Sequence, residues 1–293
     1  MLNPFRVYNY LGEVYNKLNK NIVSNKIDNK ENFLVKEGYR ISKNIIPLGS
    51  IDHIINRYHL KEKNFKKTKS NLLLPLINFE FVNKIISIQE IQNTLDFFYE
   101  NLLKRKCFLQ VPPSIVITNP EIKENIKYNI PCSWHTDYFQ EFTFHIPLSK
   151  IDKASTRTLY ASRSHKDIFI SSQGLYDINK FNYRVEEMYS NPGDVIFLDV
   201  SGLHRAELGN YRMMIQFKFT SGDNLLNDIV QKETYKKMAV IFKKNFTGDI
   251  GRVINNFKED LDNLKFINDK ENWEILKNSL PYYKSYLEGL ICS

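Results

Sequence analysis

The feature that most constrains the fold of this chain is a series of short β-type runs between residues 107 and 220. The runs alternate apolar and polar residues and are rich in β-branched and aromatic side chains. They lie at 107–118, 142–149, 156–162, 183–189, 194–200 and 211–220. Turn-forming residues separate them, notably Asn-Pro-Gly-Asp at 191–194 and Leu-Gly-Asn at 208–210. Short strands in succession with few helices between them predict a sandwich or barrel.

The segments on both sides of this β region have the apolar spacing of helices. Before it, helical spacing occurs at 4–19, 49–60 and 87–105, and an alternating strand is expected at 37–46. In the third of these helices, Ser87 and Glu90 predict a capping box. After it, residues 223–293 are again helical in pattern. We therefore expect a mainly β domain with flanking helices over 1–222, its core at 107–222, and a helical C-terminal extension packed on it.

Composition indicates a folded chain in a reducing compartment. Apolar residues make up 42% and aromatic residues 13% of the 293 residues, which is enough for a sizeable core. The cysteines, Cys107, Cys132 and Cys292, have no C-x-x-C spacing and do not suggest a disulfide framework. Charges interrupt the N-terminal apolar stretch, and no run of about 18 uncharged apolar residues occurs, so we expect neither a signal peptide nor a membrane span. The expected location is the cytoplasm.

The formal net charge is +8, and a basic cluster lies at residues 61–69. The cluster is either a solvated surface loop or a docking site for an anionic substrate group or an acidic partner. No helix-turn-helix, zinc-finger or RNA-binding signature accompanies it, so nucleic acid is not an expected partner. The sequence leaves the oligomeric state open.

Candidate metal ligands lie close together at His135 and Asp137. On an extended segment, residues two apart point to the same side, so the pair can supply two ligands to one ion. By itself the spacing does not distinguish a metal-binding pair from two polar residues at a strand end. A non-haem Fe(II) site needs two histidines and one carboxylate and leaves three positions open. His204, after the run at 194–200, can complete this set, and Arg212 at the start of the next run can hold a carboxylate.

Taken in order, these segments resemble the phytanoyl-CoA dioxygenase family of Fe(II)/2-oxoglutarate oxygenases. The resemblance is carried by "EGYRISKNII", "WHTD", "LYASRSHK", "NPGDVIFLDVSGLHRA" and "NYRMMIQFKF", and covers roughly residues 35–220. It departs from the family at Arg163, where the family has glycine before Ser-His, and in the short spacing from His204 to Arg212. The second departure makes Arg205 the fallback for Arg212.

The resemblance implies a fold, a cofactor set and site residues. The fold is a double-stranded β-helix, a jelly-roll barrel of the cupin kind. Fe(II) is held by His135, Asp137 and His204, and 2-oxoglutarate and dioxygen are cosubstrates. The far carboxylate of 2-oxoglutarate pairs with Arg212, or else Arg212 is a surface residue paired with Glu207. Because strand residues alternate faces, Gln216 lies on the same side as Arg212 and is expected to face the cosubstrate.

Other residues are assigned by their neighbourhood. Trp134, Tyr138 and Arg163 are candidates for the substrate pocket, and residues 163–182 are expected to form a mobile lid. His145 is expected to be a packed or hydrogen-bonded core histidine, and His165 to fix a turn. The helical histidines His53 and His59 are expected at the surface or in packing contacts.

The expected reaction is hydroxylation of an unactivated C–H bond in a small molecule. The basic cluster favours an anionic substrate, either a metabolite or a sugar or lipid intermediate. Cyclisation or desaturation by the same ligands stays open, as does a non-catalytic barrel that only binds a metal or metabolite. A halogenase of this fold lacks the carboxylate ligand, so Asp137 argues against that reading.

Overall fold

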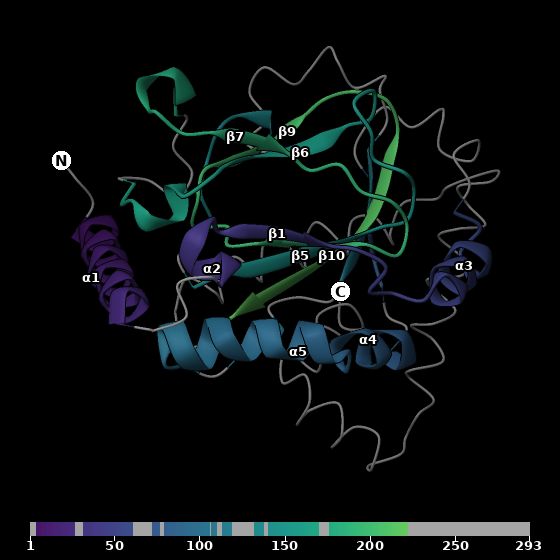
Figure 1. Cartoon of the computed structure of the whole chain (residues 1–293), viewed down its shortest axis with the longest axis horizontal. Helices are drawn as coiled ribbons and strands as arrows, with labels where there is room; N and C mark the ends of the chain where they lie inside the picture. The colour runs from purple at the N-terminus through teal and green to yellow at the C-terminus, as the bar shows by residue number, and fades with distance from the viewer. Residues whose placement is uncertain are drawn as a thin grey trace.

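A computed structural model gives the structure of the chain and describes residues 4–26, 32–60, 72–76, 79–105, 107–109, 113–118, 132–137, 140–169 and 176–221 (Figure 1). The C-terminal extension at 223–293, the basic cluster at 61–69, Tyr138 and Cys292 lie outside these residues. Cys107 and Cys132 are free thiols. Within the described part of the chain, no helix has both the length and the apolar character that crossing a membrane requires.

The described chain contains two antiparallel sheets. The large sheet has seven strands, and its order is β1-β8-β5-β10-β4-β2, with β3 paired to β10. Its strands are β1 (Tyr39–Ser42), β2 (Leu72–Pro75), β3 (Phe108–Leu109), β4 (Ser114–Thr118), β5 (Phe142–Pro147), β8 (Val195–Leu198) and β10 (Arg212–Thr220). The small sheet has the order β7-β6-β9, and its strands are β6 (Arg157–Ala161), β7 (Val185–Glu187) and β9 (His204–Glu207). The two sheets confirm the predicted β architecture of the core region.

Helices α4 (Phe79–Ile86) and α5 (Gln89–Asp96) cover the face of the large sheet that points away from the small sheet (Figure 1). Helix α5 continues into a π-helical segment, Phe97–Leu103, and the other helices are α1 (Pro4–Lys26), α2 (Phe33–Lys36) and α3 (Leu48–Arg57). Short 3-10 turns lie at Ser164–Lys166 and Ile178–Lys180. In Figure 1, α4 and α5 run beneath the large sheet, whereas α1 stands at the end of the two sheets.

The start of α5 differs from the predicted capping box, which had Ser87 as N-cap and Glu90 three residues on. The N-cap of α5 is Ile88, whose side chain makes no capping hydrogen bond. Glu90 points instead to strand β1, where its carboxylate accepts hydrogen bonds from Arg40 at 2.7 Å and from Ser42 at 2.5 Å. The carboxylate of Glu90, which the local pattern predicted at the helix terminus, therefore forms an ion pair with a strand of the large sheet.

The main core lies between the large sheet and its helices. One face of β10 supplies Met213, Ile215, Phe217 and Phe219 to this core, as strand alternation requires. Phe217 stacks on Phe144 of β5 with ring centroids 4.5 Å apart. Apolar residues of the helices, including Ile51, Ile54, Ile91 and Leu95, complete the cluster.

The space between the two sheets is apolar at one side and polar at the other. Next to β1 and β8, the sheets join through an apolar cluster of Tyr160, Met188, Ile196, Leu198 and Val200. Next to β5 and β10, the inward residues are largely polar, because Gln216 and Lys218 of β10 pair with His145 and Thr143 of β5. This polar inner face of β10 and β5 is where a ligand can be held between the sheets.

Candidate metal centre

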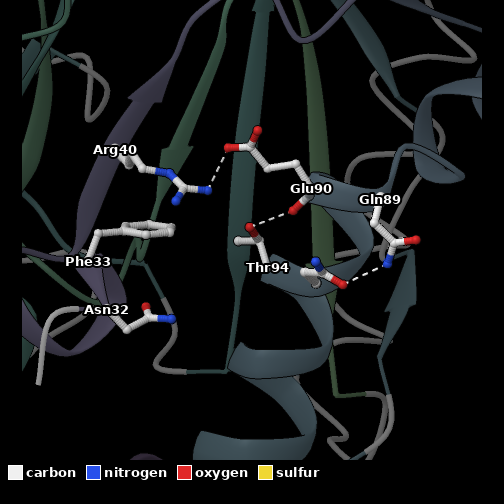
Figure 2. Close-up of a pocket in the computed structure, with 7 residues that line it drawn as sticks. Asn32, Phe33, Arg40, Gln89, Glu90 and Thr94 are labelled. Carbon is white, nitrogen blue, oxygen red and sulfur yellow. Dashed lines mark hydrogen bonds and ion pairs between the residues drawn. The ribbon is translucent and has the colours of Figure 1, made fainter. Parts of the chain in front are cut away.

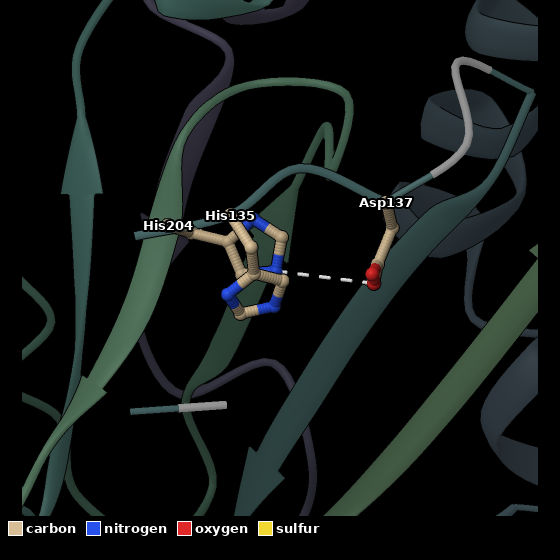
Figure 3. A group of neighbouring side chains, drawn as sticks. All are labelled: His135, Asp137 and His204. Carbon is tan, nitrogen blue, oxygen red and sulfur yellow. Dashed lines mark ion pairs between the residues drawn. The ribbon is translucent and has the colours of Figure 1, made fainter. Parts of the chain in front are cut away.

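The side chains of His135, Asp137 and His204 converge on one point between the sheets (Figure 3). One ligand atom of each residue lies within 4.8 Å of the others. The two imidazole rings are 4.3 Å apart at their centroids, inclined by 51°. Two histidines and one carboxylate form the donor set that Fe(II) takes in facial-triad sites, so these residues fit such an ion.

Backbone pairing brings these distant segments together. His135 and His204 form an antiparallel bridge, with N–H to carbonyl distances of 3.1 and 2.9 Å. Two residues further along, the N–H of Asp137 donates to the carbonyl of Val200 at 2.8 Å. The segment that carries the histidine–aspartate pair is therefore attached to the loop that precedes His204.

Each histidine is oriented by a backbone carbonyl. The Nδ1 atom of His135 lies 2.7 Å from the carbonyl oxygen of Ser133, and that of His204 lies 2.9 Å from the carbonyl oxygen of Gly202. A carbonyl only accepts, so each ring carries its proton on Nδ1. This leaves the Nε2 lone pairs of both rings available as metal ligands.

The charge states of His204 and Asp137 suit a cation. Burial lowers the pKa of His204 to about 4, helped by the neighbouring His135 and opposed by Asp137, so the ring is neutral at pH 7. Burial alone would raise the pKa of Asp137, but Lys218, His204 and His135 together hold it below its usual value. The Nζ atom of Lys218 lies 3.9 Å from Asp137 Oδ2. The site thus offers the neutral imidazole of His204, the carboxylate of Asp137 and the ring of His135 that the Ser133 carbonyl orients.

A buried cation lies on the same inner face of β10. The side chain of Arg212 is buried, and its one hydrogen bond within the described chain is a long contact of 3.4 Å from Nη2 to Thr118 Oγ1. Its Nε atom has no partner among the described residues. Burial lowers the pKa of Arg212 to about 10, so it stays charged at pH 7. A buried charge that no carboxylate of the described chain balances is costly and indicates a site for an anion.

Arg205, in contrast, lies on the outer face of the small sheet. It pairs with Glu207 and stacks over the ring of Trp134 at 5.4 Å. Glu207 is therefore the partner of Arg205 and not of Arg212, and the fallback arginine is on the wrong face for a ligand between the sheets.

Gln216 and Lys218 extend the polar inner face. Gln216 Nε2 lies 3.2 Å from His145 Nε2, to which it donates, so His145 is a hydrogen-bonded core histidine as expected. Lys218 was missed in the sequence. Strand alternation is the sequence pattern that indicates this residue. Lys218 lies two residues beyond Gln216 and four beyond Met214, on the same face of the strand as Arg212.

Neither of the two substrate-pocket candidates that the structure describes, Trp134 and Arg163, joins this group. Trp134 packs in a cluster with Leu159, Ala161 and Leu203, on the face of the small sheet that points away from the large sheet. Arg163 is exposed and precedes the 3-10 turn Ser164–Lys166 with φ of 72°. Its left-handed backbone explains why glycine suits this position. His165 of that turn is buried, and His53 and His59 are exposed.

The described parts of the expected lid are packed. Phe169, Tyr176 and Phe181 form a ring cluster beside Trp134, with Phe169–Tyr176 and Phe169–Phe181 centroids 5.0 and 5.9 Å apart. The N–H of Tyr176 donates to the carbonyl of Trp134 at 3.0 Å. This packing counts against a freely moving segment at 163–169 and 176–182. Residues 170–175 lie outside the described residues.

A separate groove of about 410 Å³ opens on the helical side of the large sheet (Figure 2). It is lined by Asn32, Phe33, Arg40, Gln89, Glu90, Asn93 and Thr94. Arg40 lies over the ring of Phe33 and is paired with Glu90. The cross-strand neighbour of Arg40 is Phe197, which belongs to the helix-side core, so the large sheet separates this groove from the metal ligands.

Comparison with known proteins gives weak fold similarities. No family model matches the chain, and no curated protein matches it. Similar solved structures include SnoN, a non-heme alpha ketoglutarate dependent epimerase from nogalamycin biosynthesis (10% identity, TM-score 0.48, 67% of this chain and 86% of that one). HygX from Streptomyces hygroscopicus with nickel and 2-oxoglutarate bound has 9% identity and a TM-score of 0.48 over 67% and 88%. EctD from S. alaskensis with 2-oxoglutarate and 5-hydroxyectoine has 10% identity and a TM-score of 0.49 over 68% and 77%. Similarities at this level do not place the chain in a family.

Proposed function

We propose that this protein is an Fe(II)/2-oxoglutarate-dependent oxygenase of the phytanoyl-CoA dioxygenase type, with a double-stranded β-helix core. The observation that carries the proposal is the convergence of His135, Asp137 and His204, with both Nε2 lone pairs available. When bound, iron and 2-oxoglutarate together supply the activation of dioxygen that oxidation of an unactivated C–H bond requires. The reaction we propose is hydroxylation.

In this function, the residues of the chain hold, orient and charge-balance the ligands. His135 and His204 present rings that backbone carbonyls orient through Nδ1, and Asp137 supplies one negative charge. Arg212 pairs with the far carboxylate of 2-oxoglutarate, with Gln216 beside it on the same face of β10. When a divalent ion is bound, the positive charges of the ion, Lys218 and Arg212 together exceed the single negative charge of Asp137. This excess favours a dianionic cosubstrate over a neutral one.

The inner face of β10 also supports an anionic substrate. Lys218 lies 3.9 Å from Asp137 Oδ2 and is balanced by it. A bound divalent ion, Arg212 and Lys218 carry four positive charges, against three negative charges on Asp137 and 2-oxoglutarate. The remaining positive charge favours an acidic group on the substrate, which we assign as a small metabolite or a sugar or lipid intermediate.

The metal assignment is tested by anaerobic titration of Fe(II) into the full chain, followed by 2-oxoglutarate. We expect one Fe(II) per chain and a metal-to-ligand charge-transfer band on adding 2-oxoglutarate. His135→Ala removes one of three ligands and should lose both signals. His53→Ala, at an exposed histidine of α3, is the matched control and should behave as wild type. Equal Fe(II) binding by His135→Ala and wild type would overturn the assignment.

The cosubstrate assignment is tested by comparing Arg212→Met with Arg205→Met in the same 2-oxoglutarate titration. Removing one partner of a buried charge pair costs about 3–5 kcal/mol, which corresponds to a loss of affinity of about two orders of magnitude or more. We expect this loss for Arg212→Met, with Fe(II) binding retained, and no loss for Arg205→Met. If Lys218→Met alone loses 2-oxoglutarate, the roles of the two cations are exchanged.

Product mass separates the reaction classes. Hydroxylation adds one oxygen atom to the substrate, whereas desaturation or cyclisation removes two hydrogen atoms. A chain that binds Fe(II) and 2-oxoglutarate but never releases succinate with any acidic small molecule would be a binding protein and not an oxygenase.

A further inference from the structure

The loop at residues 199–203 contacts two of the three metal-ligand residues. The carbonyl of Val200 accepts from the N–H of Asp137 at 2.8 Å, and the carbonyl of Gly202 accepts from Nδ1 of His204 at 2.9 Å. Any shift of this loop therefore moves the backbone of Asp137 and turns the ring of His204. The position of the loop decides whether the ligands meet.

Asp199 organises this loop from its first position. Its carboxylate is fully buried, and Oδ1 accepts from the N–H of Ser201 at 3.2 Å and from its hydroxyl at 2.7 Å. Its own N–H donates to the carbonyl of Gly38 at 2.8 Å, and its carbonyl accepts from the hydroxyl of Tyr160 at 2.8 Å. Asp199 is thus tied to β6 of the small sheet and to the residue that precedes β1 of the large sheet, as well as to the loop.

The remaining carboxylate oxygen of Asp199 is bound by the N-terminal helix. The ammonium group of Lys20 donates to Asp199 Oδ2, and the two side chains are 3% and 0% exposed. One turn earlier, Lys17 donates to the carbonyl of Ser201 at 3.1 Å and is also buried. Asn21 of the same helix donates to the carbonyl of Lys166 at 2.7 Å. Three polar side chains of α1 therefore reach the loops beside the metal ligands.

Over residues 14–15 and 17–26, the part of α1 whose side chains the structure describes, the orientation is the reverse of that expected for a helix docked by apolar burial. Its exposed face carries Tyr15, Leu18 and Ile22, which are 66%, 45% and 51% exposed, while lysines face inward. Burying two lysines is unfavourable unless each finds a partner. On this face, Lys20 pairs with Asp199 and lies over the ring of Phe98 at 4.5 Å, and Lys17 donates to Ser201 and lies over the ring of Phe169 at 5.2 Å. These polar and ring contacts, with that of Asn21 to Lys166, dock this part of α1.

We propose that Lys20, assisted by Lys17, is a positioning residue of the metal centre, which locks the loop at 199–203 so that Asp137 and His204 stay in ligand geometry. This inference rests on the proposed metal site. A buried ion pair contributes little net stability compared with an apolar pair of similar volume, but it selects one geometry. The role of this pair is to select the loop conformation in which the ligands converge.

The test is the Co(II) affinity and visible spectrum of the full chain, measured without cosubstrate or substrate. Lys20→Met removes the ammonium group and keeps the length of the side chain. Residues that orient metal ligands typically change metal affinity by about 10- to 100-fold, and we expect a loss in this range with an altered Co(II) spectrum. Lys43→Met is the matched control, because Lys43 pairs with Asp194 at 2.8 Å at the opposite end of β8 and should leave Co(II) binding unchanged.

A double variant separates positioning from the burial of a lone charge. Lys20→Met leaves the buried Asp199 without its ion-pair partner, and Asp199→Asn does the same to Lys20. Each single variant should therefore have a lower unfolding midpoint. The combined variant removes both charges and should recover much of that midpoint while Co(II) affinity stays low, because the loop is no longer locked. Recovery of Co(II) affinity along with the midpoint would overturn the inference.

Failure of the inference and failure of the proposed function give different results. If wild type binds Co(II), His135→Ala does not, and Lys20→Met binds like wild type, the metal site stands and the positioning role is wrong. If wild type itself binds no Co(II), the metal site and the positioning role both fail.

Discussion

At the scale of single residues, Gly202 shows how closely the loop before His204 is packed. A Cβ atom added there would lie 2.2 Å from the hydroxyl oxygen of Tyr160 and 2.9 Å from Ser164 Oγ. We expect Gly202→Ala to destabilise the fold by about 1–3 kcal/mol through overpacking and to weaken metal binding, since the Gly202 carbonyl orients His204. Urea denaturation and Co(II) titration measure the two effects.

Gly49 offers the matched control for this substitution. It lies exposed in α3, and an added Cβ would meet no atom within 4 Å. Gly49→Ala should leave Co(II) affinity unchanged and keep stability, or raise it by about 0.4–1 kcal/mol. Equal losses in the two alanine variants would show that close packing at Gly202 is not the cause.

His165 makes the stability of the fold depend on pH. Burial lowers its pKa to about 3, against 6.5 for an unperturbed histidine, although Asp199 opposes the shift. The unfolded chain therefore binds a proton below about pH 6.5 that the folded chain does not. The contribution of His165 is complete above pH 6.5 and is lost as pH falls toward 3, at up to about 1.4 kcal/mol per pH unit.

The variant His165→Gln removes this contribution. Its unfolding free energy, measured in urea between pH 7 and pH 5, should fall less steeply with decreasing pH than that of wild type. His59→Gln, at an exposed histidine, is the control and should keep the wild-type slope. Identical slopes in wild type and His165→Gln would show that His165 protonates equally in the folded and unfolded chain.

At the scale of elements, one face of strand β10 contributes to the stability of the fold and the other face to ligand binding. Phe217 is fully buried against Phe144 on the helical side, whereas Gln216 lies on the inner side beside His145. We expect Phe217→Ala to cost about 3–5 kcal/mol of stability. Gln216→Ala should cost about 1 kcal/mol, the net value of one hydrogen bond, and should weaken 2-oxoglutarate binding. Urea denaturation and the charge-transfer titration distinguish these outcomes, and a larger stability loss for Gln216→Ala would reverse our assignment of the faces.

At the scale of the whole molecule, metal binding should stabilise the fold. The ligands come from residues 135–137 and from His204, and an ion that binds all three binds the folded chain alone. At a metal concentration about 100 times Kd, the unfolding free energy rises by about 2.7 kcal/mol. The thermal midpoint of wild type should therefore increase with added Co(II), whereas that of Asp137→Ala should not. A midpoint that is independent of Co(II) in wild type would contradict a site that spans both segments.

The sequence by itself determined the strands and the candidate ligands of this protein. Alternation and turn residues are local patterns, so they located β5, β6, β8 and β10 and placed Arg212 and Gln216 on one face. Likewise, His135 and Asp137 share a face because they are two apart. The four-residue strand β9, which carries His204, was not predicted, because "HRAE" has no apolar alternation.

Only the tertiary structure decided which residues meet. Lys20 and Asp199 are 179 positions apart, and nothing in the periodicity of α1 indicates that its lysines face inward. Glu90 looked like a helix cap and pairs with Arg40 of another element. Trp134 is next to His135 in sequence but packs on the opposite side of the small sheet. The physical reason is that local pattern reflects backbone geometry over a few residues. The pairing of buried charges, in contrast, depends on which distant segment can satisfy them once the sheets have formed.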